Sequence, residues 1–409
     1  MIQFLSNFFR QSGIWVASSF FVTKISAFLI TLFMARMLTK EDFGWVMYGL
    51  NYLGFFLPFI GFGSSNGTLR YVAIEPNLEK KAQLNLYSFS YGLVFNFLLN
   101  IVMLVLAFIL FGSNHQTLLI AIFSVRLLGV YLLEQAKSEI RANHDNEKFA
   151  KLEIYSSLLL LFSSVLLTYF LGVKGYIISL CLSPFLILFF HNFKFSLDRK
   201  FIENIQQKEF WKYCFSMAIT NQLSELIFLL DIFFIGIFLG NTEVAQYRIY
   251  SVIPFNLFFI SALFFQTSYP KLCEKHRDNS FQIEFLINFL KIVVPVVLLI
   301  LAVAFYFDQE ILKLFGGNYH QETIVFRILI LASVSVILLR TPFGYLLASK
   351  GESRYNLIAA IISIIGLLVF IKPVISSNGL EGVAWLSLAN LTFVGVFLMG
   401  SYFYLVQKK

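Results

Sequence analysis

Charged residues inside long apolar stretches are the groups in this sequence best suited to do chemistry. Lys24 lies near the middle of the apolar stretch 14–38, and Arg126 and Arg340 lie deep inside two other stretches. A charged side chain at the centre of a bilayer costs about 2.5–3.5 kcal/mol on insertion scales, so such residues usually face a polar cavity. We therefore predict that Lys24, Arg126 and Arg340 line a cavity and bind an anionic group.

Three acidic residues are candidates for coupling or gating. Glu225 and Asp231 lie in the apolar stretch 213–239, and Glu134 lies toward the end of another. A carboxylate at this depth can take up a proton or a cation when it faces the bundle interior. Two structural interpretations compete with this one. Asp231 can brace a neighbouring span, and Lys24 and Glu225 can form a buried ion pair between the two halves of the chain.

Two further arginines are secondary candidates for binding an anion. Arg70 falls in a loop after the second apolar stretch, and Arg327 falls near the start of the tenth. Long charged side chains at helix ends also extend along apolar surface to reach water. That alternative applies to Arg327 and to Glu134.

The sequence contains no arrangement typical of an enzyme. It has no His/Glu metal pair, no Gly-rich phosphate loop, no nucleophile elbow and no ATPase signature. We expect no catalytic residue, no bound metal and no cofactor. The energy for any transport then comes from the membrane potential or from a proton or sodium gradient.

The composition is that of a polytopic membrane protein. Hydrophobic residues make up 58% of the chain and charged residues only 13%, about half the charged fraction of a soluble protein. About 20 apolar residues cross a bilayer as a helix. On this basis we predict an all-α fold of about twelve spans: 14–38, 43–63, 84–111, 117–141, 150–172, 175–193, 213–239, 244–269, 285–307, 323–348, 355–374 and 381–404.

The distribution of basic residues predicts the orientation. Most of the 31 Lys and Arg residues fall on the side that also holds both termini. Lys and Arg concentrate in cytoplasmic loops, so both termini are predicted to be cytoplasmic. The net charge of +8 is explained by these short loops, and we expect no binding to nucleic acid.

The chain reads as two related halves. The segment 41–44 aligns with 242–245, and 142–149 resembles 348–355. We predict an N-terminal bundle over 1–195, a cytoplasmic linker over 196–212 and a C-terminal bundle over 213–409. Each half holds an even number of spans, so the two bundles are parallel repeats, and a transporter with its site at the repeat interface is the expected consequence.

Three short motifs resemble a known family. Ala35–Gly44, Asp231–Tyr247 and Leu314–Tyr319 are similar to segments of the Wzx-type polysaccharide and O-antigen flippases. These flippases belong to the multidrug/oligosaccharidyl-lipid/polysaccharide exporter (MOP) superfamily.

The resemblance implies a fold, a substrate and a location. It implies two six-helix bundles that form a V around a central cavity. The implied substrate is an oligosaccharide repeat unit on undecaprenyl diphosphate, flipped by alternating access to the outer leaflet of the bacterial inner membrane. The implied partners are a polysaccharide polymerase and the chain-length machinery.

Three other functions remain open at this point. A multidrug cation antiporter of the same superfamily, driven by protons or sodium, is expected to have an acidic cavity, whereas the deep charges here are mostly basic. A flippase for another lipid-linked cell-wall precursor shares the same physical requirements. A membrane glycosyltransferase or polymerase calls for a sizeable outer loop with catalytic acids, and the predicted outer loops are short.

Overall fold

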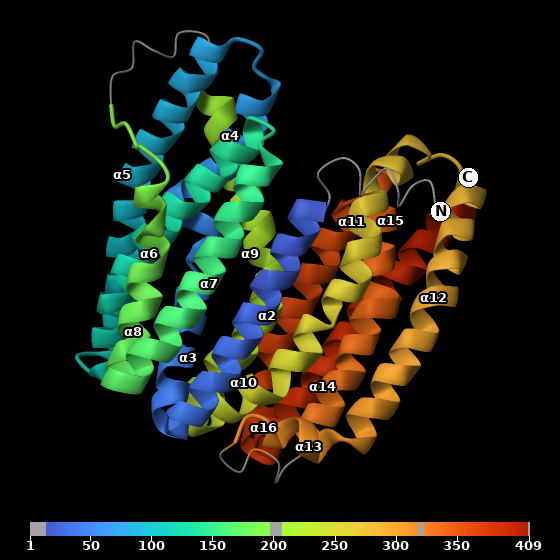
Figure 1. Ribbon diagram of the computed structural model, residues 1–409. Coiled ribbons are helices and arrows are strands. Elements are labelled where there is room, and N and C mark those ends of the chain that lie inside the picture. Colours follow the sequence, from blue (N-terminus) through green and yellow to red (C-terminus); the bar gives the residue numbers. More distant parts are fainter. Residues whose placement is uncertain (1–13, 197–206, 317–318, 320–322, 408–409) are drawn as a thin grey trace. The chain divides into compact units, whose positions relative to one another are not determined.

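The computed structural model describes residues 14–196, 207–316, 319 and 323–407. Within these residues the regular structure is helical and no β-strand occurs (Figure 1). The prediction of an all-α fold is confirmed.

Contacts divide the chain into two compact units. The first contains Met1–Leu38 and Trp45–Gln222, and the second contains Thr39–Gly44 and Leu223–Lys409, as far as these ranges are described. The predicted bundle boundaries at 195 and 213 remain a prediction. The boundary between the two contact units falls between Gln222 and Leu223, close to a bend in the helix that contains them.

The helices of the first half are α2 (Ile14–Met37), α3 (Lys40–Gly54), η2 (Leu57–Gly63), α4 (Ser64–Ile74), α5 (Leu78–Phe111), α6 (His115–Ala142), α7 (Asn146–Leu171), α8 (Val173–Leu182) and η3 (Ser183–Phe189). Side chains cap several of them. Asn77 accepts from two backbone N–H groups at the start of α5, and Asn114 does the same for α6. Such caps satisfy donors that the first helical turn leaves unpaired.

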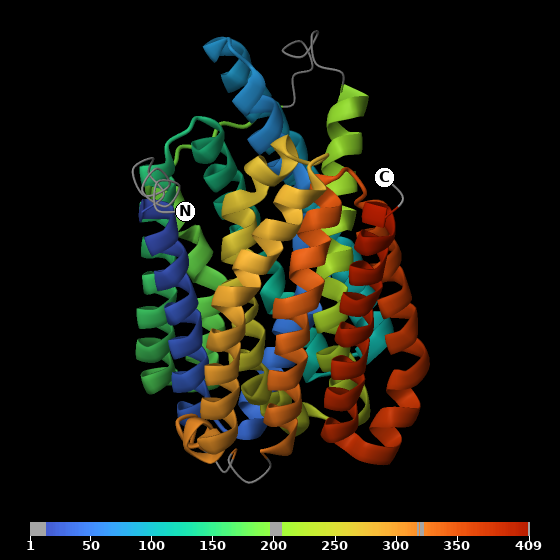
Figure 2. The same cartoon turned by 90° about the vertical axis from the view of Figure 1, so that its right-hand side faces the viewer.

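The helices of the second half are α9 (Gln207–Phe238), α10 (Asn241–Asn256), α11 (Phe258–Glu274), α12 (Asn279–Tyr306), α13 (Asp308–Lys313), α14 (Ile324–Ser335), η6 (Val336–Arg340), α15 (Thr341–Ser349) and α16 (Arg354–Gln407). Figure 2 shows that α16 folds back on itself. The turn is at Gly379, whose φ of 53° lies in the left-handed region that favours glycine.

Each predicted span corresponds to a helical segment. Among the described residues nine helices are long and apolar enough to cross a membrane, and ten if the two parts of α9 count as one span. The nine include α16 once, although the turn at Gly379 separates its two arms. The segment Val173–Phe189 is a shorter apolar helix, because Pro184 interrupts it.

Three of the prolines lie where the helices change geometry, whereas Pro254, Pro295 and Pro373 lie inside α-helices. Pro58 lies in the 3₁₀ segment η2, and Pro184 lies in the 3₁₀ segment η3. Pro342 follows the π-helical turn η6, in which the Thr341 N–H bonds to the carbonyl of Val336. Proline has no N–H and its ring collides with the preceding turn, so the backbone before it adopts a tighter or wider helix.

Helix α9 carries the chain from the first unit to the second. Its first part packs in the first unit, where Phe210 and Cys214 are fully buried. Two glycines of the first unit, Gly63 and Gly67, have no room for a Cβ beside Cys214. Small residues of this kind let two membrane helices approach closely, so α4 and α9 pack backbone to backbone.

The short segment Thr39–Gly44 belongs to the second unit, although its flanking helices belong to the first. Phe43 is fully buried, and a Cβ on Gly44 would collide with the backbone carbonyl of Asn241. Lys40 lies over the ring of Tyr319, with its Nζ 4.7 Å from the ring centroid. Thr39–Gly44 is part of Ala35–Gly44, one of the three motifs behind the family resemblance. This part of the motif is therefore tightly packed within the second unit.

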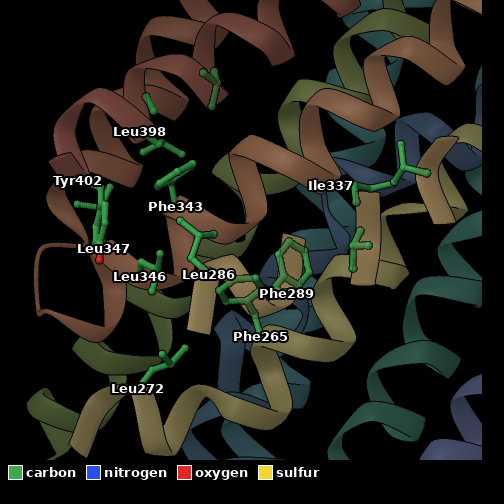
Figure 3. Packing of buried hydrophobic residues seen from close by; sticks show 14 residues of the cluster. Phe265, Leu272, Leu286, Phe289, Ile337, Phe343, Leu346, Leu347, Leu398 and Tyr402 are labelled. Carbon is green, nitrogen blue, oxygen red and sulfur yellow. The ribbon is translucent and has the colours of Figure 1, made fainter. Parts of the chain in front are cut away.

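The second unit has its own apolar core (Figure 3). Phe265 and Phe289 stack edge to face with ring centroids 5.0 Å apart. At one end of the core the Tyr402 hydroxyl donates to the Oε1 atom of Gln282, at 3.2 Å. In lipid, packing and interhelical hydrogen bonds of this kind hold helices together, because burial of apolar surface gives little driving force there.

Candidate functional site

Asp231 lies at the centre of a hydrogen-bonded cluster in the second unit. It is buried on α9, and its Oδ2 accepts hydrogen bonds from Ser387 Oγ of α16 at 2.5 Å and from the Tyr247 hydroxyl of α10 at 2.9 Å. Its other oxygen, Oδ1, is buried and has no hydrogen-bond partner among the described residues. A carboxylate placed in an apolar interior in this way is costly unless a proton or a cation joins it.

A narrow crevice opens beside this carboxylate within the second unit. Its lining includes Asp231 and Ser387 together with the amide of Asn390 and the ring of Phe228. Oxygen atoms that can accept a proton or coordinate a small cation therefore line the same crevice. The three helices α9, α10 and α16 fix these groups.

Arg340 lies beside α9. Its guanidinium Cζ is 5.5 Å from the centroid of the Phe228 ring, and the charge of Glu225 acts on it. Glu225 is exposed on α9, whereas Asp231 is buried, so the two carboxylates lie in different surroundings. The π-helical turn before Pro342 ends at Arg340. Turns of this type often occur at functional sites.

The second unit thus brings Glu225 and Arg340 near each other, whereas Asp231 lies in its own cluster with Tyr247 and Ser387. Lys24, the other member of the ion pair considered for Glu225, lies in the first unit on α2. The side chain of Lys24 is exposed, and no described residue forms an ion pair with it. Its role in binding an anion stays a prediction.

Arg126 points into the first unit and bonds to the backbone. Its Nη1 donates to the carbonyl of Leu180 on α8. That carbonyl would normally accept from the residue four positions later, which is Pro184 and has no N–H. Neighbouring side chains commonly satisfy carbonyls that a proline frees in a membrane helix. The observed contact of Arg126 is therefore a structural brace.

Glu134 is part of an ion triad in the first unit. Lys137 Nζ lies 2.9 Å from a carboxylate oxygen of Glu134 and 2.9 Å from one of Glu153. Only 9% of the Lys137 side chain is exposed. The sequence analysis treated Lys137 as one of the basic residues that set the orientation. The spacing of Glu134 and Lys137 was a usable signal, but the contribution of Glu153 from α7 depends on tertiary packing.

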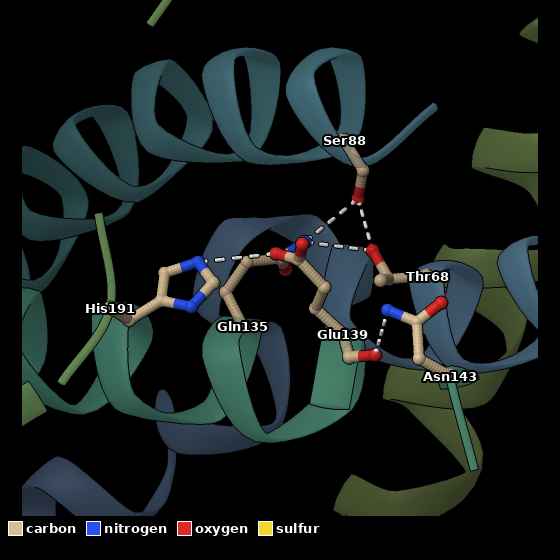
Figure 4. Close-up of polar contacts among 6 residues, drawn as sticks. All are labelled: Thr68, Ser88, Gln135, Glu139, Asn143 and His191. Carbon is tan, nitrogen blue, oxygen red and sulfur yellow. Dashed lines mark hydrogen bonds and ion pairs between the residues drawn. The ribbon is translucent and has the colours of Figure 1, made fainter. Parts of the chain in front are cut away.

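A polar network also lies along one side of α6 (Figure 4). Gln135 is buried and donates to Thr68 Oγ1 at 2.7 Å and to Ser88 Oγ at 3.2 Å. One turn later, Glu139 pairs with His191 at 3.2 Å. Sequence reasoning did not identify these residues. Hydroxyl and amide groups of this kind hydrogen-bond across membrane helices.

The two secondary arginines have different surroundings. Arg70 is exposed and lies over the rings of Tyr213 and Tyr71, at 4.5 and 5.6 Å from their centroids. Arg327 Nε lies 2.6 Å from Asp308 Oδ2. Arg327 therefore has a buried acidic partner, whereas Arg70 is held by aromatic faces.

Asp308 lies outside the membrane-spanning helices, and its surroundings shift its pKa. Burial by itself raises the pKa of this carboxyl group. Hydrogen bonds from Thr323, Arg327 and the Gln309 N–H, together with the charge of Arg327, outweigh that effect, and the pKa of Asp308 is held below its ordinary value.

No group of three or more His, Cys, Asp or Glu side chains that could hold a metal ion occurs in the part of the chain that the structure describes. The ionisable groups of the site are single carboxylates and cations among hydroxyl and amide groups. Such an arrangement suits binding and proton or monovalent-cation exchange.

Comparison with known proteins gives a family match and several structural likenesses. A family model described as "Polysaccharide biosynthesis protein" matches residues 33–325, more than half of the chain. No curated protein matches the sequence.

Three solved structures illustrate the likeness in fold. The lipid II flippase MurJ in an inward closed conformation is 15% identical with a TM-score of 0.74, over 95% of this chain and 87% of that one. The MATE transporter VcmN of Vibrio cholerae is 14% identical with a TM-score of 0.66, over 100% of this chain and 99% of that one. Another multidrug transporter of this type is described as a member of the MOP superfamily and has a TM-score of 0.62 at 16% identity, over 92% of this chain and 93% of that one. The chain therefore belongs to the polysaccharide biosynthesis protein family and has the fold of the MOP-superfamily transporters.

Proposed function

We propose that the protein is a flippase that moves an undecaprenyl-diphosphate-linked oligosaccharide repeat unit from the cytoplasmic to the outer leaflet of the bacterial inner membrane. The observation that carries the proposal is the conjunction of the family match with the fold of a lipid flippase. The proposal places both termini in the cytoplasm and a polysaccharide polymerase and the chain-length machinery downstream.

The charges of the chain support this substrate. A lipid-linked diphosphate carries roughly two negative charges and a glycan that cannot cross hydrocarbon unaided. In the proposal, Arg340 and Lys24 take the diphosphate through charge-assisted hydrogen bonds. Arg340 is held half-buried beside Phe228 and Glu225, and the Lys24 side chain is exposed. The binding of an anion by Arg126 remains part of the proposal, and the contact that its guanidinium makes in the structure is with the Leu180 carbonyl of α8.

We also propose that Asp231 couples transport to an inward proton or sodium ion. Its unpartnered buried oxygen and the hydroxyl groups of Tyr247 and Ser387 support this role. The membrane potential adds to the driving force, since moving one charge across 100 mV is worth about 2.3 kcal/mol.

Removal of the protein from the bacterium that makes it tests the proposal in cells. We expect surface polysaccharide to be lost and the lipid-linked repeat unit to accumulate, with its glycan shielded from a lectin added outside spheroplasts. Re-expression of the wild-type chain restores export. If the accumulated glycan is instead accessible from outside, the protein acts after translocation and the proposal is wrong.

A multidrug cation antiporter is the competing function, and the fold of the MATE transporters is compatible with it. The buried Asp231 is the observation that favours it. In cells lacking the protein, increased sensitivity to cationic dyes with normal surface polysaccharide would identify this alternative.

A further inference from the structure

A buried amide in the first unit lacks hydrogen bonds. Asn96 on α5 is fully buried, and neither its Oδ1 nor its Nδ2 has a partner among the described residues. One turn later the Oδ1 of Asn100 is also buried without a partner, while its Nδ2 donates to the backbone carbonyl of Asn96 at 3.0 Å. Buried polar groups nearly always bind a partner, so this amide is suited to bind a group from outside the protein.

Asn96 lies on the stretch of α5 that packs against the interruption in the second span. The ring of Phe95, the preceding residue, stacks on Phe62 with centroids 5.0 Å apart. A Cβ on Gly92, one turn before Asn96 on the same face of α5, would touch Ser64 Oγ. The residues around Asn96 on α5 therefore pack against Phe62 and Ser64, at the C-terminal end of the interruption that runs from Ile60 to Gly63.

The backbone at this interruption is not helical. Ile60 is extended, with φ −52° and ψ 132°, and Phe62 has a φ of 56°. A left-handed conformation is rare for a residue other than glycine and is commonly found at ligand sites. Because the ladder of helical hydrogen bonds is broken here, backbone carbonyls lose their usual donors. Unwound carbonyls in broken membrane helices are known to coordinate sodium ions or protons.

We infer that this seam between α5 and the broken helix binds a sodium ion. The Oδ1 atoms of Asn96 and Asn100 and one or more carbonyl oxygens of residues 57–63 are the ligands. All of these ligands are neutral oxygens, which suits a monovalent cation better than Mg²⁺ or Ca²⁺, whose sites use carboxylates. The site lies in the first unit and differs from the Asp231 cluster of the second.

A sodium ion bound at this position would stabilise the non-helical backbone of the interruption. The binding of sodium at this position does not depend on the proposed function. Its consequence, that inward sodium helps to drive export, rests on the proposed function.

The experiment measures the melting temperature of the purified full-length protein against NaCl, with KCl replacing NaCl at constant ionic strength. We expect a saturable rise with NaCl and none with KCl. Asn96→Ala and Asn100→Ala should each require at least tenfold more NaCl for the same rise. Ser90→Ala is the matched control, since Ser90 is a buried polar residue of the same helix whose Oγ accepts a hydrogen bond from the Ser196 N–H. This variant should keep the sodium response.

Two results would overturn the inference. The first is an equal response of the wild-type protein to NaCl and KCl, confirmed by absence of ²²Na⁺ binding, which needs no variant. The second is a higher melting temperature of Asn96→Leu than of the wild-type protein in both salts. A seam that binds no ion becomes more stable when a buried, unpaired amide is removed. Sodium binding without glycolipid flipping would leave this inference intact and count against the proposed function.

Discussion

Asp231 and Ser387, which are 156 residues apart in the sequence, share a hydrogen bond of 2.5 Å inside the second unit. The serine comes from the returning arm of α16, beyond the turn at Gly379. The hairpin of α16 is thus what delivers a hydroxyl group to the buried carboxylate of α9. Tyr247 adds a second hydroxyl from α10.

This relationship predicts the effect of neutralising the carboxylate. Asp231→Asn keeps the shape of the side chain but removes the exchangeable charge. We expect gradient-driven transport to be lost while the protein is made in normal amounts, as measured by flipping in proteoliposomes with an imposed proton or sodium gradient. Glu381→Gln, at an exposed position of α16, is the control and should transport normally. Gradient-driven transport by Asp231→Asn at the wild-type rate would remove Asp231 from the coupling mechanism.

Arg340 and Lys24 are predicted to bind the diphosphate. Arg340→Ala or Lys24→Ala should abolish export of the repeat unit without lowering the amount of protein in the membrane. Arg340→Lys should retain part of the activity, because it keeps the charge but loses the planar donor fork. Arg354→Ala, which removes an exposed arginine paired with Glu352, provides the control. Normal export by both alanine variants would show that Arg340 and Lys24 are not needed to bind the diphosphate.

The contact between Arg126 and Leu180 predicts a coupling with Pro184. Arg126→Ala leaves the Leu180 carbonyl without its donor, and we expect a loss of about 1.5–3 kcal/mol of stability. In a Pro184→Ala background the restored N–H can serve that carbonyl, so the same change should cost less. A double-mutant cycle of unfolding free energies measures the difference. Additive effects of the two substitutions would mean that Arg126 does not serve the carbonyl that Pro184 leaves unpaired.

Gly44 is predicted to be required for packing of the Thr39–Gly44 segment in the second unit. Gly44→Ala places a Cβ against the Asn241 carbonyl, and overpacking of this kind costs about 1–3 kcal/mol or more. Thermal unfolding of the purified protein measures the loss. Gly400→Ala is the control, since no atom lies within 4 Å of its added Cβ. That change should be neutral or slightly stabilising, because alanine favours helices over glycine. Equal melting temperatures of Gly44→Ala and Gly400→Ala would argue against tight packing of Gly44 against Asn241.

The ion pair between Asp308 and Arg327 predicts a pH dependence of stability. A carboxyl group whose pKa is lowered on folding stabilises the protein above its unfolded pKa, about 3.9, and loses that contribution as the pH falls through the folded value. Asp308→Asn should therefore melt below wild type at neutral pH, and the two should converge at acidic pH. Glu310→Gln, at an exposed pair with Lys313, should show little difference at either pH. A constant gap for Asp308→Asn at all pH values would contradict this account.

The sequence predicted the helices well because hydrocarbon imposes a simple rule. A chain that crosses lipid must satisfy its backbone internally, so each long apolar stretch became a helix. The two arms of α16 were separated correctly in the prediction, although only Gly379 turns the chain between them. Pro58, Gly61 and Gly63 stand where the second span is interrupted, but the left-handed conformation of Phe62 between them cannot be read from the sequence.

The site was predictable only in part. Deep charges identified Asp231, Glu225 and Arg340, because a charge in an apolar stretch stands out by itself. Partners from other helices do not stand out, since Ser387 is one serine among many. The bond from Arg126 to Leu180 also depends on a backbone carbonyl that no side-chain pattern reports. Lys137 appeared as an ordinary basic residue until folding placed Glu153 beside it.

The central claim is that this chain flips a lipid-linked glycan, and reconstitution tests it most directly. Purified protein in liposomes is given a diphosphate-linked glycolipid or a cationic dye, with a membrane potential imposed in either direction. We expect the glycolipid alone to change leaflet, faster when the potential drives its negative charge. Movement of the dye under a proton or sodium gradient, with a stationary glycolipid, would contradict the account and identify an antiporter.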